Sequence, residues 1–135
     1  MPFVVDNSVV VAWHLGSQAT PYSDAVLNAL GGEMGHVPAL WPLEFSNVVR
    51  KALVAMKITE ERAREIMQIQ TKLALTVHGD TPLPAENMAL ALRYQLSSYD
   101  AAYLDLALRL RLPLASTDDA LRDAALAAGV GVFMP

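Results

Sequence analysis

The feature that most constrains this 135-residue chain is an apolar run near its N-terminus that ends on an acid. Phe3, Val4 and Val5 favour a strand, and Asp6 follows them directly. An ionised carboxylate at the end of a buried strand costs free energy unless a partner neutralises it or water reaches it. We therefore expect the end of the first strand to be a place where the charge of Asp6 is compensated.

Strand patterns alternate with helical patterns along the whole sequence. Short apolar stretches predict strands at 3–6, 36–39, 112–116 and 130–134. Apolar residues at helical spacing, with capping residues before them, predict helices at 9–15, 21–30, 42–56, 59–75, 85–96, 99–111 and 118–128. Ser8 is the expected cap of the first helix, and Ser97 or Ser98 that of the sixth. The alternation predicts one α/β domain over 1–135, a three-layer α/β/α arrangement with a short central parallel sheet.

The composition limits the kinds of site and partner. The chain has no cysteine, so any metal would be a hard ion held by oxygen. Its net charge of −4 argues against a broad basic surface for nucleic acid, but not against a site where metal ions supply the positive charge. A hydrophobic content of 53% indicates that some apolar surface faces another chain. We find no membrane span and no basic leader, and expect a soluble cytoplasmic protein.

Four acids from distant segments are expected at one edge of the sheet. In an open parallel sheet, ligands bind beyond the carboxyl ends of the strands. Asp6 ends the first strand, Asp118 and Asp119 follow a later one, and Glu44 and Asp100 lie in first turns of helices. Two carboxylates about 4 Å apart repel by roughly 4 kcal/mol at an effective dielectric constant of 20. Such a cluster requires a cation, and oxygen ligands suit Mg²⁺ or Mn²⁺.

Three segments carry a resemblance to a known family. They read V-V-D-N-S from residue 4, W-P-L-E-F from residue 41, and S-Y-D-A-A-Y-L-D-L-A-L-R-L-R-L-P-L-A-S-T-D from residue 98. Together they resemble the PIN domain, and specifically the VapC toxin ribonucleases of prokaryotic toxin–antitoxin pairs. The resemblance covers nearly the whole chain. It implies Mg²⁺- or Mn²⁺-dependent cleavage of RNA phosphodiester bonds by metal-activated water, a homodimer, and inhibition by a cognate antitoxin.

The resemblance also implies which acids carry the chemistry. Asp6 matches the first acid of the family, Glu44 its helix glutamate, and Asp100 the acid of its Y-D-A segment. These three and Asp118 are the expected catalytic and metal-binding residues. The register of S-T-D-D leaves Asp119 as the alternative fourth acid, and otherwise as an outer-shell residue.

Other polar side chains are candidates for supporting roles. Ser8 and Thr117 resemble positions whose hydroxyls orient an acid or a metal-bound water. An acidic chain must hold RNA through local cations. Four basic residues are candidates for this, each of them alternatively a solvated surface charge: Arg50, Lys51, Arg93 and Arg122.

Some residues near these motifs have simpler interpretations. Asp105 is expected to pair on the surface with Arg109, four residues further along the helix. Tyr99 and Tyr103 share a helix face and are expected to pack in the core. The three histidines have neither metal-ligand spacing nor a nucleophile partner, and we assign them no chemistry.

Two other functions are weighed against a nuclease. A haloacid-dehalogenase-like phosphatase would also place acids after the first and last strands. That chemistry requires a second Asp where this chain has Ser8, and a lysine before the final acids, whereas the last lysine here is Lys72. The other alternative is a non-catalytic α/β protein-binding module whose acids are structural. Metal binding would distinguish it from the nuclease.

Overall fold

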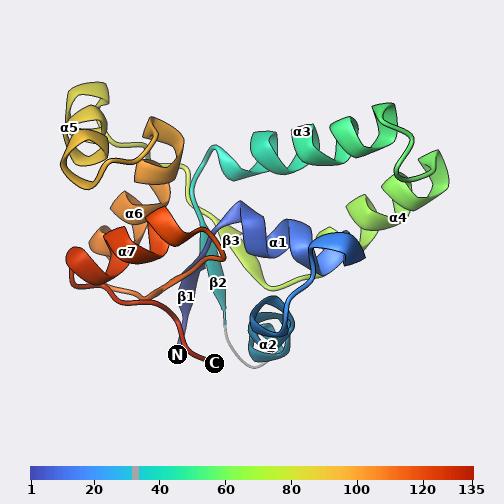
Figure 1. Ribbon diagram of the computed structural model, residues 1–135, viewed down its shortest axis with the longest axis horizontal. Coiled ribbons are helices and arrows are strands. Elements are labelled where there is room, and N and C mark those ends of the chain that lie inside the picture. Colours follow the sequence, from blue (N-terminus) through green and yellow to red (C-terminus); the bar gives the residue numbers. More distant parts are fainter. Residues whose placement is uncertain (32–33) are drawn as a thin grey trace.

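The computed structural model, which describes residues 1–31 and 34–135, contains a parallel sheet between two helical layers (Figure 1). The four strands are β1 (Phe3–Val5), β2 (Gly35–Val37), β3 (Leu75–Val77) and β4 (Leu114–Ala115). Their order in the sheet is β3-β2-β1-β4, and every pairing is parallel. The predicted three-layer α/β/α fold is therefore confirmed.

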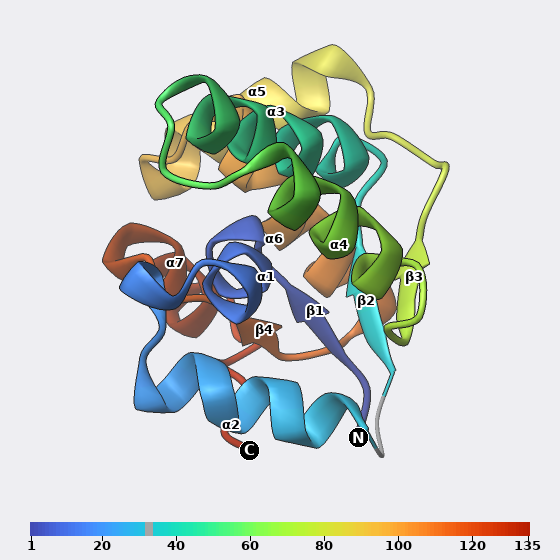
Figure 2. The same cartoon turned by 90° about the vertical axis from the view of Figure 1, so that its right-hand side faces the viewer.

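Helices cover both faces of the sheet. On one side lie α1 (Asn7–His14), the short 3₁₀ helix η1 (Gly16–Gln18), α2 (Pro21–Leu30), α3 (Trp41–Val54) and α4 (Glu60–Gln70). On the other side lie α5 (Pro84–Tyr94), α6 (Ser98–Leu110) and α7 (Asp119–Ala127). Figure 2 shows α3 and α4 side by side in front of the sheet, and in Figure 1 they extend beyond it as a two-helix arm. None of the described helices is long and apolar enough to cross a membrane.

The core is built around β1, which lies between β2 and β4. All three residues of β1 are fully buried, as expected for a strand covered on both faces. From one face α1 contributes Val9 and Val10, and from the other α6 contributes Leu104 and Leu106, all with no exposed surface. The carboxyl end of β1 is therefore enclosed within the core of the domain.

The structure corrects three sequence-based expectations about the elements. The helix predicted over 59–75 ends at Gln70, and β3 follows it as an edge strand. The strand β3 pairs with β2 and is partly exposed. Its residues belong to the apolar stretch L-A-L-T-V from residue 73, and no Gly or Pro separates this stretch from the helix before it, so the pattern reads as a continuation of that helix. No strand forms over the described residues 130–134, where Val132 makes a single bridge to Leu114. The cap of α1 is Asp6, and Ser8 lies inside the helix.

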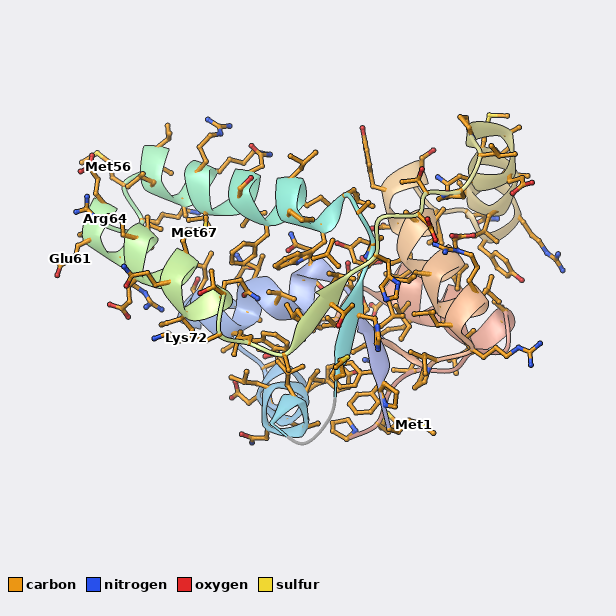
Figure 3. The ribbon with its side chains drawn as sticks, turned by 180° about the vertical axis from the view of Figure 1, so that it is seen from behind. Met1, Met56, Glu61, Arg64, Met67 and Lys72 are labelled. Carbon is orange, nitrogen blue, oxygen red and sulfur yellow. The ribbon has the colours of Figure 1, made fainter. Side chains whose placement is uncertain are left out.

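The arm formed by α3 and α4 carries much of the exposed apolar surface. Figure 3 shows Met56, Glu61 and Arg64 at its outer end, Met67 along it and Met1 well away from it. Met56 is 89% exposed, and Leu43, at the other end of α3, is 74% exposed. This helix pair therefore carries part of the expected surplus of apolar surface, and α5 exposes further apolar side chains such as Met88 and Leu92.

Gly35 allows β2 to pack closely against its neighbours, which predicts an effect of adding a single methyl group. A Cβ atom at Gly35 would lie 2.7 Å from Cδ2 of Leu75 and 3.1 Å from Cδ1 of Leu30. We expect Gly35→Ala to lower the free energy of unfolding by about 1 kcal/mol, because a leucine must turn away from its best packing. Urea denaturation measures this. In the control, Gly16→Ala, the added Cβ has nothing within 4 Å, and equal losses in both variants would contradict the prediction.

Candidate active site

Asp6 lies at the enclosed end of β1 and is 6% exposed. Its Oδ2 atom accepts a hydrogen bond from Oγ of Ser8 at 2.7 Å and another from Oγ of Ser116 at 2.9 Å. Burial raises the pKa of Asp6 to about 6, although the two hydroxyl groups act in the opposite direction. The negative charge of this carboxylate is thus only partly compensated within the protein.

The other predicted acids face the same edge of the sheet. Glu44 lies in the first turn of α3 and Asp100 in the first turn of α6, and these helices begin beside the carboxyl ends of the strands (Figure 1). Burial raises the pKa of both acids. The charge of Asp100 raises the pKa of Asp6 and of Glu44, and the charge of Asp118 raises that of Asp100. The four acids therefore share one region of negative potential.

These four carboxylates do not by themselves form a complete metal-binding site. Within 1–31 and 34–135, no three Asp, Glu, His or Cys side chains are arranged so that they could hold one metal ion as they stand. The chemistry of the donors nevertheless fits a hard divalent cation, because the groups are carboxylate and hydroxyl oxygens around a buried acid. Mg²⁺ keeps several of its own waters, so it does not need all four carboxylates at bonding distance.

Ser116 joins Asp6 to Asp118. Its side chain is fully buried, and its Oγ atom donates to Asp6 and accepts from the backbone N–H of Asp118 at 3.0 Å. Oδ2 of Asp118 in turn accepts the backbone N–H of Leu121 at 2.9 Å, so Asp118 caps α7. Sequence reasoning did not single out Ser116. The available signal was its place in the S-T-D-D segment directly after a strand.

The supporting candidates take different positions. Ser8 contacts Asp6 as described, and its Oγ atom also accepts the backbone N–H of Thr117 at 3.3 Å. Thr117 thus contributes its backbone to the site. Asp119 is the first residue of α7, whereas the charge that raises the pKa of Asp100 belongs to Asp118. This arrangement favours Asp118 over Asp119 as the fourth acid.

The basic candidates lie in different environments. Arg122 donates from Nη1 to the backbone carbonyl of Ser116 at 2.8 Å, and its guanidinium carbon lies 4.8 Å from the ring centre of Tyr22. Arg122 therefore braces the turn that holds Ser116. Arg50 and Lys51 are exposed on α3, where Arg50 also donates to Asn47.

The remaining polar groups near the motifs have local partners. Arg93 is exposed and lies over the ring of Tyr94, with 5.4 Å between the guanidinium carbon and the ring centre. The expected pair of Arg109 and Asp105 is confirmed, with 2.8 Å between Nε and Oδ2. The three histidines are hydrogen-bonded among themselves or to an amide side chain: His14 to Gln70, and His36 to His78.

Tyr103 has a polar contact that the sequence did not reveal. It is fully buried, as expected, but its hydroxyl donates to Oε1 of Glu44 at 2.6 Å. Burial raises the pKa of this phenol, and the charges of Glu44, Asp6 and Asp100 raise it further. The expectation that Tyr99 also packs in the core is wrong, because it is 67% exposed in the first turn of α6.

Replacing Asp6 with Asn should remove a pH dependence of stability. The pKa of Asp6 rises from 3.8 to about 6 on folding, so the folded protein binds this proton more tightly than the unfolded chain does. The resulting stability is present below pH 3.8 and is lost as the pH rises through 6. The full difference is about 3 kcal/mol, with about 2 kcal/mol between pH 4 and pH 7.

Urea denaturation in EDTA across this pH range measures the effect. The free energy of unfolding of the wild type, relative to Asp6→Asn, should fall by about 2 kcal/mol from pH 4 to pH 7. If the difference in the free energy of unfolding between the two proteins stays constant with pH, folding does not raise the pKa of Asp6.

Comparison with known proteins agrees with this fold. The crystal structure of PAE2754 from Pyrobaculum aerophilum is similar in fold, with a TM-score of 0.62 and 20% sequence identity over 92% of this chain and 84% of that chain. No curated protein matches the sequence. The sequence model described as PIN domain matches residues 3–126, a range that contains all four strands and all four acids. The chain therefore belongs to the PIN domain family.

Proposed function

We propose that this chain is a metal-dependent endoribonuclease and the toxin of a type II toxin–antitoxin pair, acting in the cytoplasm. PIN domains are generally nucleases, which supports the hydrolase activity. The observation that carries the proposal is that Asp6, Glu44, Asp100 and Asp118, from four distant segments, act on one another's charge at the carboxyl edge of the sheet. Such repulsion destabilises the folded protein unless a cation or a cationic ligand binds among the carboxylates and offsets it.

The proposed cofactor is Mg²⁺ or Mn²⁺, with Asp6 and Asp100 as direct ligands and Glu44 and Asp118 binding the ion or its waters. When bound, a divalent ion supplies an activated water for attack on phosphorus and offsets the charge that develops there. The protein's own contribution is to hold the carboxylates in place. The hydroxyls of Ser8 and Ser116 fix Oδ2 of Asp6.

The proposed roles of the remaining candidates follow from their contacts. Ser8, Thr117 and Asp119 form the outer shell of the site. RNA would be held by Arg50 and Lys51, which are exposed on the helix that carries Glu44, with Arg93 and Arg122 as further candidates. Because Arg122 is already engaged with Ser116, its substitution would also disturb the site itself.

The apolar arm supports the proposal that protein partners bind here, a cognate antitoxin and a second copy of the chain. Two hollows of about 330 and 410 Å³ lie along α3 and α4 and share Ser46 and Met67. Their linings are predominantly apolar and include Phe45, Val49 and Leu53. Exposed apolar surface of this kind is typical of a binding face.

One alternative has an observation in its favour. Among the described residues, no three side chains are arranged to hold a metal ion. A metal-free protein-binding module with structural acids would lack such a group as well. The phosphatase alternative has no such support, because the chain belongs to the PIN domain family. A metal titration separates the nuclease from the binding module.

Mn²⁺ or Mg²⁺ should raise the melting temperature of the wild type but not that of Asp6→Asn. At about 100 times its dissociation constant, an ion that binds only the folded state adds about 2.7 kcal/mol, or about 10 °C for a chain of this size. Thermal denaturation with and without the ion measures this. An absent shift in the wild type, or an equal shift in both proteins, would favour the binding module.

Asp100→Asn should abolish RNA cleavage and leave the metal-free protein equally or more stable. The substitution removes a ligand, and it relieves repulsion with Asp6, Glu44 and Asp118. Cleavage of total RNA and urea denaturation in EDTA give the two measurements.

The matched control is Asp105→Asn, which lies on the same helix but pairs with Arg109 on the surface. We expect it to retain cleavage, because an exposed ion pair contributes at most about 0.5 kcal/mol to stability. Retained cleavage by Asp100→Asn, or its strong destabilisation without metal, would count against the acid cluster as the active site.

A further inference from the structure

We propose that Tyr103 is a positioning residue of the metal site, because its hydroxyl fixes the carboxylate of Glu44 in the orientation that serves the ion. This inference rests on the proposed function and goes beyond it, since the nuclease chemistry requires four acids and does not require a tyrosine at this point. The contact crosses from α6 to α3, between residues 59 positions apart in the sequence.

The geometry of the contact is that of a strong hydrogen bond. The distance from the Tyr103 hydroxyl to Oε1 of Glu44 is 2.6 Å, within the range of O–H···O⁻ bonds in which the acceptor is ionised. A phenol has an ordinary pKa near 10, so at neutral pH it donates its proton and holds the carboxylate as an acceptor. The bond involves Oε1, and Oε2 remains available to an ion or to its water.

The position of the hydroxyl is itself fixed by packing. The ring of Tyr103 has no exposed surface, and its neighbours along α6, Leu104 and Leu106, are also fully buried. A buried hydroxyl without a partner is costly, so the bond to Glu44 also satisfies Tyr103. The pairing therefore links a rigid element of the core to a side chain that would otherwise be mobile.

The benefit for the site is entropic. A glutamate has three rotatable side-chain bonds, and ordering a long flexible side chain costs up to about 2 kcal/mol. Since Glu44 is held before any ion arrives, that cost does not reduce the affinity for the metal. The carboxylate of Asp6 is held by serine hydroxyls, that of Asp118 by a backbone N–H, and Asp100 has a shorter side chain, whereas Glu44 depends on Tyr103.

The test is the Mn²⁺ affinity of Tyr103→Phe, measured by isothermal titration calorimetry without RNA. Phenylalanine fills the same space and removes only the hydroxyl. We expect the dissociation constant for Mn²⁺ to rise roughly tenfold, the effect of losing one hydrogen bond to a charged group. Tyr94→Phe, a tyrosine of α5 that lies beside Arg93, is the matched control and should bind Mn²⁺ like the wild type.

The same substitution in a Glu44→Ala variant distinguishes an effect of Tyr103 on the Glu44 carboxylate from a general effect on the fold. In Glu44→Ala the hydroxyl has no carboxylate to hold, so adding Tyr103→Phe should cause no further loss of Mn²⁺ affinity. An equal loss in both backgrounds would mean that Tyr103 acts through the fold alone, and would overturn the inference. If Tyr103→Phe does not fold, Tyr103→Leu removes the hydroxyl with another apolar side chain and is compared in the same two backgrounds, where a loss caused by packing alone appears equally in both.

The outcomes also separate this inference from the proposed function. A wild type that binds no Mn²⁺ would overturn both. A wild type that binds Mn²⁺, with Tyr103→Phe binding equally well, would overturn the role of Tyr103 and leave the nuclease proposal in place.

Discussion

The structure depends on the burial of one carboxylate at the centre of a parallel sheet. Asp6 follows β1, which is covered on both faces and flanked by β2 and β4, so its carboxylate is almost fully buried. Its oxygen is held by Ser8 from α1 and by Ser116 from the end of β4. Since Ser116 is 110 residues from Asp6, this arrangement exists only once β4 has paired beside β1. Formation of the sheet and assembly of the site are therefore the same event.

The magnitudes indicate how the acids are tolerated without an ion. Glu44 and Asp100 lie in first turns of helices, and Asp118 accepts a backbone N–H at the start of α7. Each such position stabilises a negative charge by about 0.3–1 kcal/mol. The pKa values of Asp6, Glu44 and Asp100 are nevertheless raised, first by burial and then by the charges of the neighbouring acids. Helix ends therefore reduce the cost of gathering the acids but do not remove it. A bound divalent cation would offset the repulsion that remains among the carboxylates.

The parts of this molecule that could be predicted from sequence are those determined by patterns of neighbouring residues. The apolar run before Asp6, the Pro21–Leu30 helix and the surface pair of Asp105 and Arg109 are all local patterns, and the structure has them where they were expected. The bonds of Ser116 to Asp6 and of Tyr103 to Glu44 join residues 110 and 59 positions apart. No local pattern records such contacts, because a serine after a strand and a tyrosine on an apolar helix face are also ordinary packing residues. The edge strand β3 was missed because its apolar stretch, L-A-L-T-V from residue 73, follows α4 with no Gly or Pro between them to mark where the helix ends.

The helix α3 connects the candidate active site with the apolar arm. Its first turns carry Glu44, held from the core by Tyr103, and line one apolar hollow of the arm. Its later turns carry Arg50 and line the other hollow. A helix is stiff over this distance, so a protein seated along the arm contacts the same rigid element that presents a site acid and a candidate RNA-binding cation. Removing the four site acids from the net charge of −4 leaves zero, so the rest of the chain carries no net positive charge to recruit RNA. A partner on the arm would therefore act on substrate access and on metal binding together, without needing to enter the site.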